Sequence, residues 1–228
     1  QPWRIAMSLV REAFGPGWKR TASRLGITPE GISVDSMEKI LETGVNSPLC
    51  SSLGRLFDGV ASIVGLKRSV SFEGQAAMGL EAAAGPDSGD ILPYEIRSGG
   101  DSLVLDPAAF VRAIVQGKLG GADTSLLAGS FHRTLAAAFT DMALRIQAHT
   151  GLGRVVLSGG CFQNRILLEG CVAGLEQAGL EVFGPVILES EAVLEVFTHQ
   201  RVPANDGGVS LGQAVVAGTR IMRNRHTA

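Results

Sequence analysis

One segment constrains the fold more than any other part of the chain. The apolar run "RVVLS" leads directly into Gly159 and Gly160, a helical pattern follows in residues 165–177, and the apolar run "LEVF" comes next at 180–183. Glycine reaches positive φ without a Cβ clash, so the glycine pair fits a tight turn between a strand and a helix. It equally fits a turn whose backbone approaches an anionic ligand at a helix start. A strand, a glycine turn, a helix and a strand in this order are typical of nucleotide-binding α/β folds.

Two common nucleotide-binding motifs are excluded by the same residues. The turn does not match the dinucleotide signature GxGxxG, and no GK[ST] triplet of a Walker A loop occurs in the chain. Any nucleotide site here is therefore of another type.

Apolar spacing predicts helices in most of the remaining chain. The expected helices cover residues 2–14, about 36–44, 53–64, 71–84, 107–119, 125–150 and 209–223. A β-hairpin with its turn at 99–101 precedes the fifth of these. We expect a mainly helical lobe at about 1–150 and a nucleotide-binding α/β lobe at about 151–228. On this pattern His132 is interpreted as a helix-face residue rather than a metal ligand.

Composition excludes several classes of protein. The chain has 228 residues, 45% of them hydrophobic and 18% charged, with a formal net charge of −2, which argues against disorder and against a nucleic-acid partner. Its three cysteines lack metal-ligand spacing and indicate reduced thiols in a cytoplasmic protein. No apolar run is long enough to span a bilayer, so no membrane contact is expected. The start at Gln1 rather than Met suggests a piece of a longer polypeptide.

Four segments in register resemble one known family. "SSLGRLFDGVA", "VSFEGQAAMGLE", "VVLSGGCFQNRILLE" and "RVPANDGGVSLGQAVVA" are similar to the C-terminal carbamoyltransferase domain of the hydrogenase maturation protein family HypF. The resemblance implies an α/β fold of the actin-like ATPase type, found also in sugar kinases and Hsp70. A mixed sheet flanked by helices is then expected, in a partial two-lobed domain.

The resemblance also implies an activity and its partners. Family members transfer a carbamoyl group from carbamoyl-adenylate, made from ATP, to the C-terminal cysteine of a HypE-type partner, which leads to the cyanide ligands of nickel-iron hydrogenase. Acylphosphatase-like and YrdC-like domains precede this region in the family, and we expect the isolated fragment to be inactive. Two alternatives stay open: a non-catalytic lobe that binds nucleotide and docks a partner, and a sugar-kinase-like ATPase.

The resemblance assigns nucleotide contacts residue by residue. Asp58 occupies the position of a ribose-binding aspartate, although a solvated or capping role is the alternative. Gly159 and Gly160 would approach the nucleotide phosphate, and the Asn164 amide would hydrogen-bond the nucleotide.

Two further positions follow from the same resemblance. Glu73 and Gly74 match positions that contact nucleotide or substrate, although Glu73 also fits a favourable charge near a helix start. No residue is assigned a catalytic role.

Asp206, in "NDGG", resembles a metal-binding aspartate of the family. There a carboxylate joins two histidines of an HxxxH element to hold a divalent metal such as iron or zinc. The four histidines of this chain are not spaced in that way, so we expect this chain alone to carry no metal. Residues 184–197 are expected to be an insertion or a local duplication, because "LEVF" recurs within them.

Overall fold

The structure, a computed structural model, describes residues 1–85, 89–100 and 102–183. Its helices are α1 (Pro2–Phe14), α2 (Trp18–Leu25), α3 (Val34–Thr43), α4 (Leu53–Ile63), α5 (Gln75–Ala83), α6 (Ala108–Leu119), α7 (Thr124–Thr150) and α8 (Arg165–Gln177). Two short 3-10 turns are η1 (Gly15–Gly17) and η2 (Gly160–Gln163). The strands are β1 (Glu95–Gly99), β2 (Ser102–Asp106), β3 (Arg154–Val156) and β4 (Glu181–Phe183).

Most predicted elements that fall on described residues are confirmed. Helix α3 ends, as expected, at Gly44, which adopts the left-handed conformation. The exception is α2, which is not among the helices that the spacing predicts, because "GPG" at 15–17 interrupts the helical pattern. Instead, these residues form a single 3-10 turn, and the chain resumes as a helix that buries Trp18 in the core.

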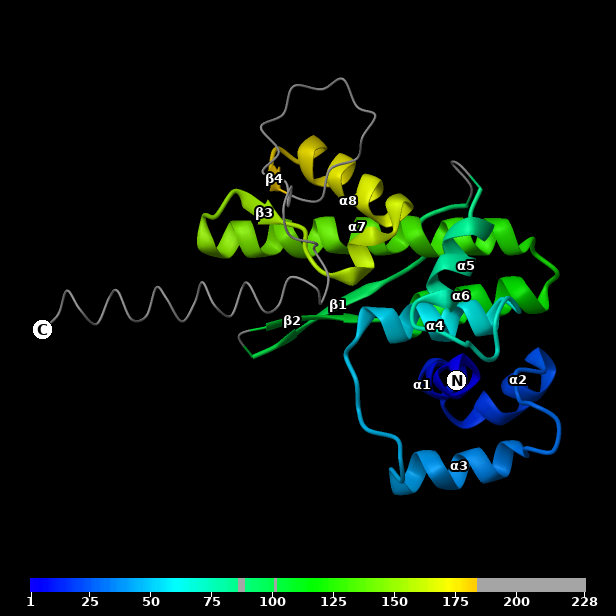
Figure 1. The fold of residues 1–228 in the computed structure, drawn as a ribbon. Coiled ribbons are helices and arrows are strands. Elements are labelled where there is room, and N and C mark those ends of the chain that lie inside the picture. Colours follow the sequence, from blue (N-terminus) through cyan, green and yellow to red (C-terminus); the bar gives the residue numbers. More distant parts are fainter. Residues whose placement is uncertain (86–88, 101, 184–228) are drawn as a thin grey trace, which may run out of the picture.

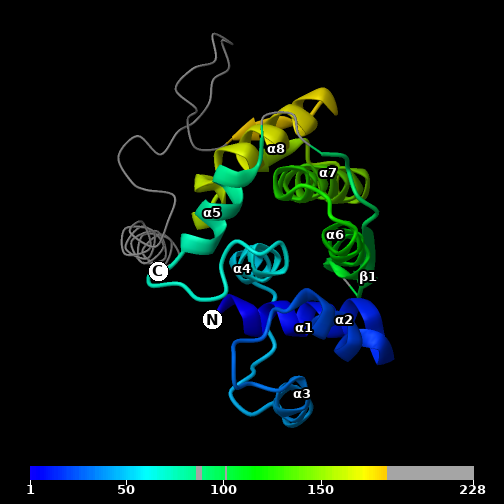
Figure 2. The same ribbon diagram turned by 90° about the vertical axis from the view of Figure 1, so that its right-hand side faces the viewer.

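The core is formed mainly between helices. Figure 2 shows α1 crossing next to α4, with α6 beside both helices and α7 beyond them. Gly59 allows the α1–α4 contact, since a Cβ there would lie 2.4 Å from Leu9 Cδ1 and 3.0 Å from Ile5 Cγ2. Phe57, Phe110 and Phe131 are fully buried between α4, α6 and α7. Within residues 2–85, 89–100 and 102–150, helices are therefore the main elements, and the division into two lobes stays a prediction.

The two sheets are small. Strands β1 and β2 form the expected antiparallel hairpin, in which Glu95 pairs with Asp106. Strands β3 and β4 pair in parallel, with Val155 opposite Val182, and α8 connects them. The α/β prediction is therefore confirmed. The mixed sheet that the resemblance implies is not formed within residues 1–85, 89–100 and 102–183, because the α/β part supplies only β3 and β4 there.

Helix α7 packs against α8, and the hairpin lies beside α7 (Figure 1). It has 27 residues and is capped by Asp123, which accepts a hydrogen bond from the Ser125 N–H at 2.8 Å. Among the described helices, none combines the length and apolar character that crossing a bilayer requires.

Candidate functional site

Asp58 lies in the middle of α4 and is only 5% exposed. Its Oδ2 atom is 2.9 Å from Nη1 of Arg55, whose side chain is 44% exposed. Burial raises the pKa of the Asp58 carboxyl above its ordinary value of 3.8, and the Arg55 charge opposes that rise. Asp58 is thus neither solvated nor a helix cap. A carboxylate buried in this way is an uncommon feature that often marks a functional position.

Arg55 also brings Glu73 and Gly74 to the same place. Its Nη2 atom is 3.6 Å from Glu73 Oε1, and Gly74 follows as the N-cap of α5 with a φ of 82°. The Glu73 side chain is 88% exposed, so its ion pair with Arg55 contributes little to stability. Three predicted site residues therefore gather around one arginine.

The glycine turn, Gly159 and Gly160, joins β3 to η2 and then to α8. The predicted order of strand, glycine turn and helix start is confirmed. Gly159 has a φ of 104°, a conformation that L side chains rarely adopt. Among the described residues, a Cβ placed on either glycine would meet no atom within 4 Å beyond its chain neighbours, so the turn is open toward this part of the chain.

Cys161, which follows the glycine turn, lies near the first turn of α4. Cys161 Sγ lies 4.0 Å from where a Cβ on Gly54 would stand, one helical turn before Asp58. On the other side, Glu81 of α5 accepts a hydrogen bond from the backbone N–H of Arg165 at 2.7 Å. Helices α4, α5 and α8 therefore converge beside the turn (Figure 2). Asp58 lies on α4, whereas Glu73 and Gly74 lie at the opposite end of α5 from Glu81, so a single site formed by all the predicted residues stays a prediction.

Asn164 is buried, and its side-chain amide is engaged within the protein. Its Oδ1 atom accepts the Leu167 N–H at 2.9 Å, which caps α8, and its Nδ2 atom lies 2.9 Å from Nε2 of His132. One N–H and one lone pair of the amide remain beyond these two bonds. The contact with a nucleotide therefore stays a prediction.

His132 confirms its interpretation as a helix-face residue. Its Nδ1 atom is 2.7 Å from the carbonyl oxygen of Ala128, which can only accept, so Nδ1 carries the proton and Nε2 accepts from Asn164. Burial lowers the pKa of His132 below its ordinary value of 6.5. The sequence did not indicate its link to Asn164, because the two residues are 32 positions apart.

The predicted metal position, Asp206, lies outside the described residues, as does the insertion at 184–197. Within the described ranges, no group of three or more His, Cys, Asp or Glu side chains is placed to hold a metal ion. The role of Asp206 stays a prediction.

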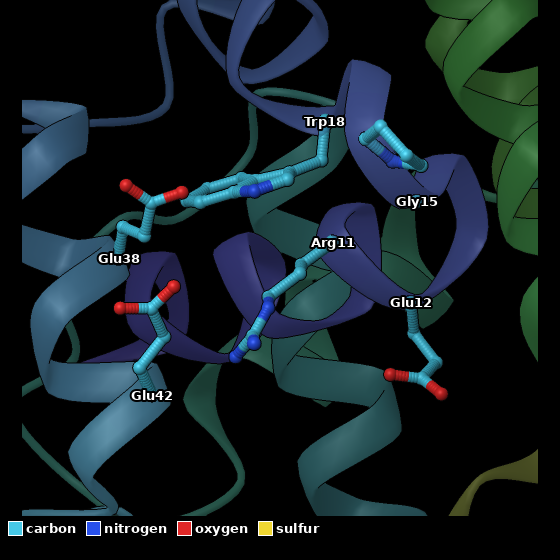
Figure 3. A pocket seen from close by; sticks show the side chains of 7 residues that line it. Arg11, Glu12, Gly15, Trp18, Glu38 and Glu42 are labelled. Carbon is cyan, nitrogen blue, oxygen red and sulfur yellow. The ribbon is translucent and has the colours of Figure 1, made fainter.

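A surface pocket lies away from this region, between α1, α2 and α3 (Figure 3). Its lining is Arg11, Glu12, Gly15, Pro16, Trp18, Glu38 and Glu42. None of these is a predicted site residue, and Glu38 already forms an ion pair with Lys19. The pocket adds nothing to the site around Asp58.

Comparisons with known proteins agree with the resemblance. The family model described as "Carbamoyltransferase, Kae1-like Domain, second subdomain" matches residues 1–213. The carbamoyltransferase HypF of Rhizobium leguminosarum bv. viciae is 33% identical over 232 residues, which cover 100% of this chain and 27% of that protein. The Synechocystis carbamoyltransferase HypF is 31% identical over 229 residues, covering 93% and 27%.

A solved structure supports the same grouping. The full-length HypF crystallised in its phosphate- and nucleotide-bound form has a TM-score of 0.79 and 34% identity, covering 95% of this chain and 31% of that one. The present chain spans 27% of the length of the two curated relatives. Because the family model covers nearly the whole sequence, the chain belongs to the Kae1-like carbamoyltransferase domain family, of which it is the second subdomain.

Proposed function

We propose that this chain is the part of a HypF-type carbamoyltransferase that holds the adenosine and phosphate of carbamoyl-adenylate. The observation that carries the proposal is the buried Asp58 carboxylate on α4, a helix whose first turn lies near Cys161, the residue after the open glycine turn. The relatives are named carbamoyltransferases, and one solved relative binds phosphate and nucleotide.

The side chains present have suitable chemistry for this ligand. The Asp58 carboxylate can accept hydrogen bonds from two neighbouring ribose hydroxyls, which would compensate for the cost of burying it. The glycine turn offers backbone N–H groups to a phosphate without side chains in the way. Together they resemble the two ends of a nucleoside phosphate site of the actin-like ATPase type.

The reaction itself would take place on a partner in the cytoplasm. The thiolate of the C-terminal cysteine of a HypE-type protein attacks the carbamoyl carbon of carbamoyl-adenylate. A C–S bond forms, the bond to the adenylate phosphate oxygen breaks, and AMP leaves. The S-carbamoyl group is the precursor of the cyanide ligands of nickel-iron hydrogenase.

A divalent metal is part of the family resemblance, with Asp206 as one ligand. The described part of the chain offers no donor set for it, so we derive no step through a metal. In this proposal the described residues bind and orient the nucleotide.

The test is substitution of Asp58 with a matched control. In Asp58→Asn the side chain keeps its shape and loses its charge, and we expect affinity for AMP or ATP to fall at least about tenfold, as for loss of a hydrogen bond to a charged group. The control Asp141→Asn breaks a similar ion pair, Asp141–Arg145 on α7, and should leave affinity unchanged. Chemical-shift titration by NMR measures both, because binding by this chain alone is expected to be weak.

Thermal unfolding of the same variants separates binding from folding. Asp58→Asn should unfold at the same or a slightly higher temperature, a change of less than about 1 kcal/mol, since it removes a buried charge whose partner Arg55 is exposed. Unchanged nucleotide affinity in a folded Asp58→Asn variant would contradict the proposal. In a full-length HypF-type protein that contains this chain, loss of carbamoyl transfer with retained partner binding in Asp58→Asn would support the enzyme over the docking lobe.

A further inference from the structure

We propose that His132 is a positioning residue for the glycine turn, acting through Asn164. The inference rests on the proposed role of that turn in binding a nucleotide phosphate. His132 would touch no substrate. Its function would be to keep the start of α8, and with it Gly159 and Gly160, in one orientation.

The first support is the close contact between α7 and α8. A Cβ on Gly170 would lie 3.0 Å from Ala136 Cβ, and one on Gly174 would lie 2.6 Å from Thr140 Oγ1. The contacts advance in the same direction along both helices, so α7 and α8 run parallel, as Figure 1 allows the reader to follow. His132 lies four residues before Ala136, on the same face of α7.

The polar link between His132 and Asn164 therefore closes this contact at the end next to the glycine turn. The imidazole is fully buried, and its tautomer is fixed because Nδ1 donates to the Ala128 carbonyl oxygen. Nε2 is then an acceptor, aimed at Asn164 Nδ2 at 2.9 Å. That bond decides which end of the Asn164 amide is the nitrogen, and it turns Oδ1 toward the Leu167 N–H.

The glycine turn needs such an anchor because it has little packing of its own. In the part of the chain that the structure describes, no atom beyond the chain neighbours lies within 4 Å of where a Cβ on Gly159 or Gly160 would stand. Its conformation therefore depends on the residues that follow, and Asn164 is the buried polar residue among these. A rotated Asn164 amide would lose the cap and loosen the first turn of α8.

The same imidazole also contacts the other half of the site. Its ring centroid lies 5.4 Å from that of Phe57 and 5.7 Å from that of Phe131. Phe57 immediately precedes Asp58 on α4. His132 thus contacts the neighbour of the ribose-side carboxylate and the residue that anchors the phosphate-side turn.

Two substitutions of His132 distinguish the acceptor function of Nε2 from the donor function of Nδ1. His132→Gln places an amide oxygen near the Nε2 position and can still accept from Asn164. His132→Asn places its amide near Nδ1, so it can still donate to Ala128 but offers no acceptor to Asn164. We expect His132→Asn to weaken AMP binding about tenfold and His132→Gln to stay within about threefold of the original chain.

NMR of the nucleotide-free chain measures chemical shifts, which a loss of stability alone would not change in a chain that stays folded. The backbone amide signals of Gly159 and Gly160 and the side-chain NH₂ signal of Asn164 should shift in His132→Asn and return toward their original positions in His132→Gln. If His132→Asn does not fold, Asn164→Asp tests the link from the other side. It keeps the cap oxygen and removes the donor, and the same glycine signals should shift.

The outcomes distinguish this inference from the proposed function. Equal glycine signals and equal affinities in the two folded His132 variants would overturn the positioning role. If the original chain binds no nucleotide while the glycine signals still respond to His132→Asn and recover in His132→Gln, the proposed function fails and the positioning of the turn stands.

Discussion

Two helix pairs in this chain approach closely through glycine, and they differ in what the close approach achieves. At the α1–α4 contact, Gly59 faces the apolar side chains of Ile5 and Leu9 and the backbone of Ala6. At the α7–α8 contact, Gly170 and Gly174 face Ala136 and the Thr140 hydroxyl, and a buried hydrogen bond closes the contact.

The difference shows that close helix packing through glycine can serve two different purposes. At the α1–α4 contact, the glycine lets two helices approach closely, and the apolar side chains there exclude water and fill space. The α7–α8 contact holds a histidine and an asparagine in register, and an unpaired buried polar group there would cost a good deal. The second contact is also the one next to the predicted nucleotide residues.

The largest expected effect on stability comes from a substitution that disrupts the apolar α1–α4 contact. Gly59→Val should lower the free energy of unfolding by about 3 kcal/mol, because the new side chain overlaps Leu9 and Ile5 between two packed helices. Urea denaturation measures the change. The double variant with Leu9→Ala should recover part of the loss, since it empties the space that the valine needs. Simple additivity of the two losses would show that α1 and α4 do not meet as described.

An intermediate effect is expected at the polar contact. Asn164→Ala should cost about 2 kcal/mol, of which about half is the lost cap of α8 and the rest the unpaired His132 nitrogen. Ser33→Ala is the matched control, because Ser33 caps α3 by accepting from the Ser36 N–H at 3.1 Å on an exposed surface. We expect about 1 kcal/mol for the control. Equal losses in the two variants, measured by urea denaturation, would mean that the bond to His132 adds nothing.

The smallest effect is a dependence of stability on pH. His132 stays neutral in the fold, because burial lowers its pKa, whereas in the unfolded chain it titrates near its ordinary value of 6.5. The unfolded chain therefore binds more protons as the pH falls through that value, and the fold loses stability on the acid side. Between about pH 7 and about pH 5.5 the loss is at most about 1.3 kcal/mol.

His132→Gln isolates this contribution. Asp58 acts in the opposite direction, since its raised pKa makes the fold less stable as the pH rises above the ordinary value of 3.8. The difference between the original chain and His132→Gln cancels that term. Thermal unfolding across this range should show a flatter dependence in the variant, and parallel curves would argue that His132 is not held neutral by its surroundings.

Much of the local structure followed from the sequence. Apolar spacing placed the helices, Gly44 marked the end of α3, and the glycine pair marked the turn between β3 and α8. These features depend on residues close together along the chain. Helix α2 was missed, because a glycine-proline-glycine break says nothing about whether a buried tryptophan can restart a helix after it.

For the candidate site, too, some features could be predicted from the sequence and others required the fold. The segments that carry Asp58, Glu73 and the glycine turn were recognised in the sequence, since each is a contiguous motif. That Arg55 joins Asp58 to Glu73, and that Cys161 after the turn lies near the start of α4, required the fold.

The sequence by itself determined which segments are helices and strands, and it marked His132 as part of a helix face. Only the tertiary structure decided that Asp58 is buried and that His132 accepts a hydrogen bond from Asn164, 32 positions later. The physical reason is that periodicity reports which face of a helix is apolar, but not what packs against it. Burial, hydrogen-bond partners and shifted pKa values belong to pairs of elements, and their positions are fixed only when the chain folds.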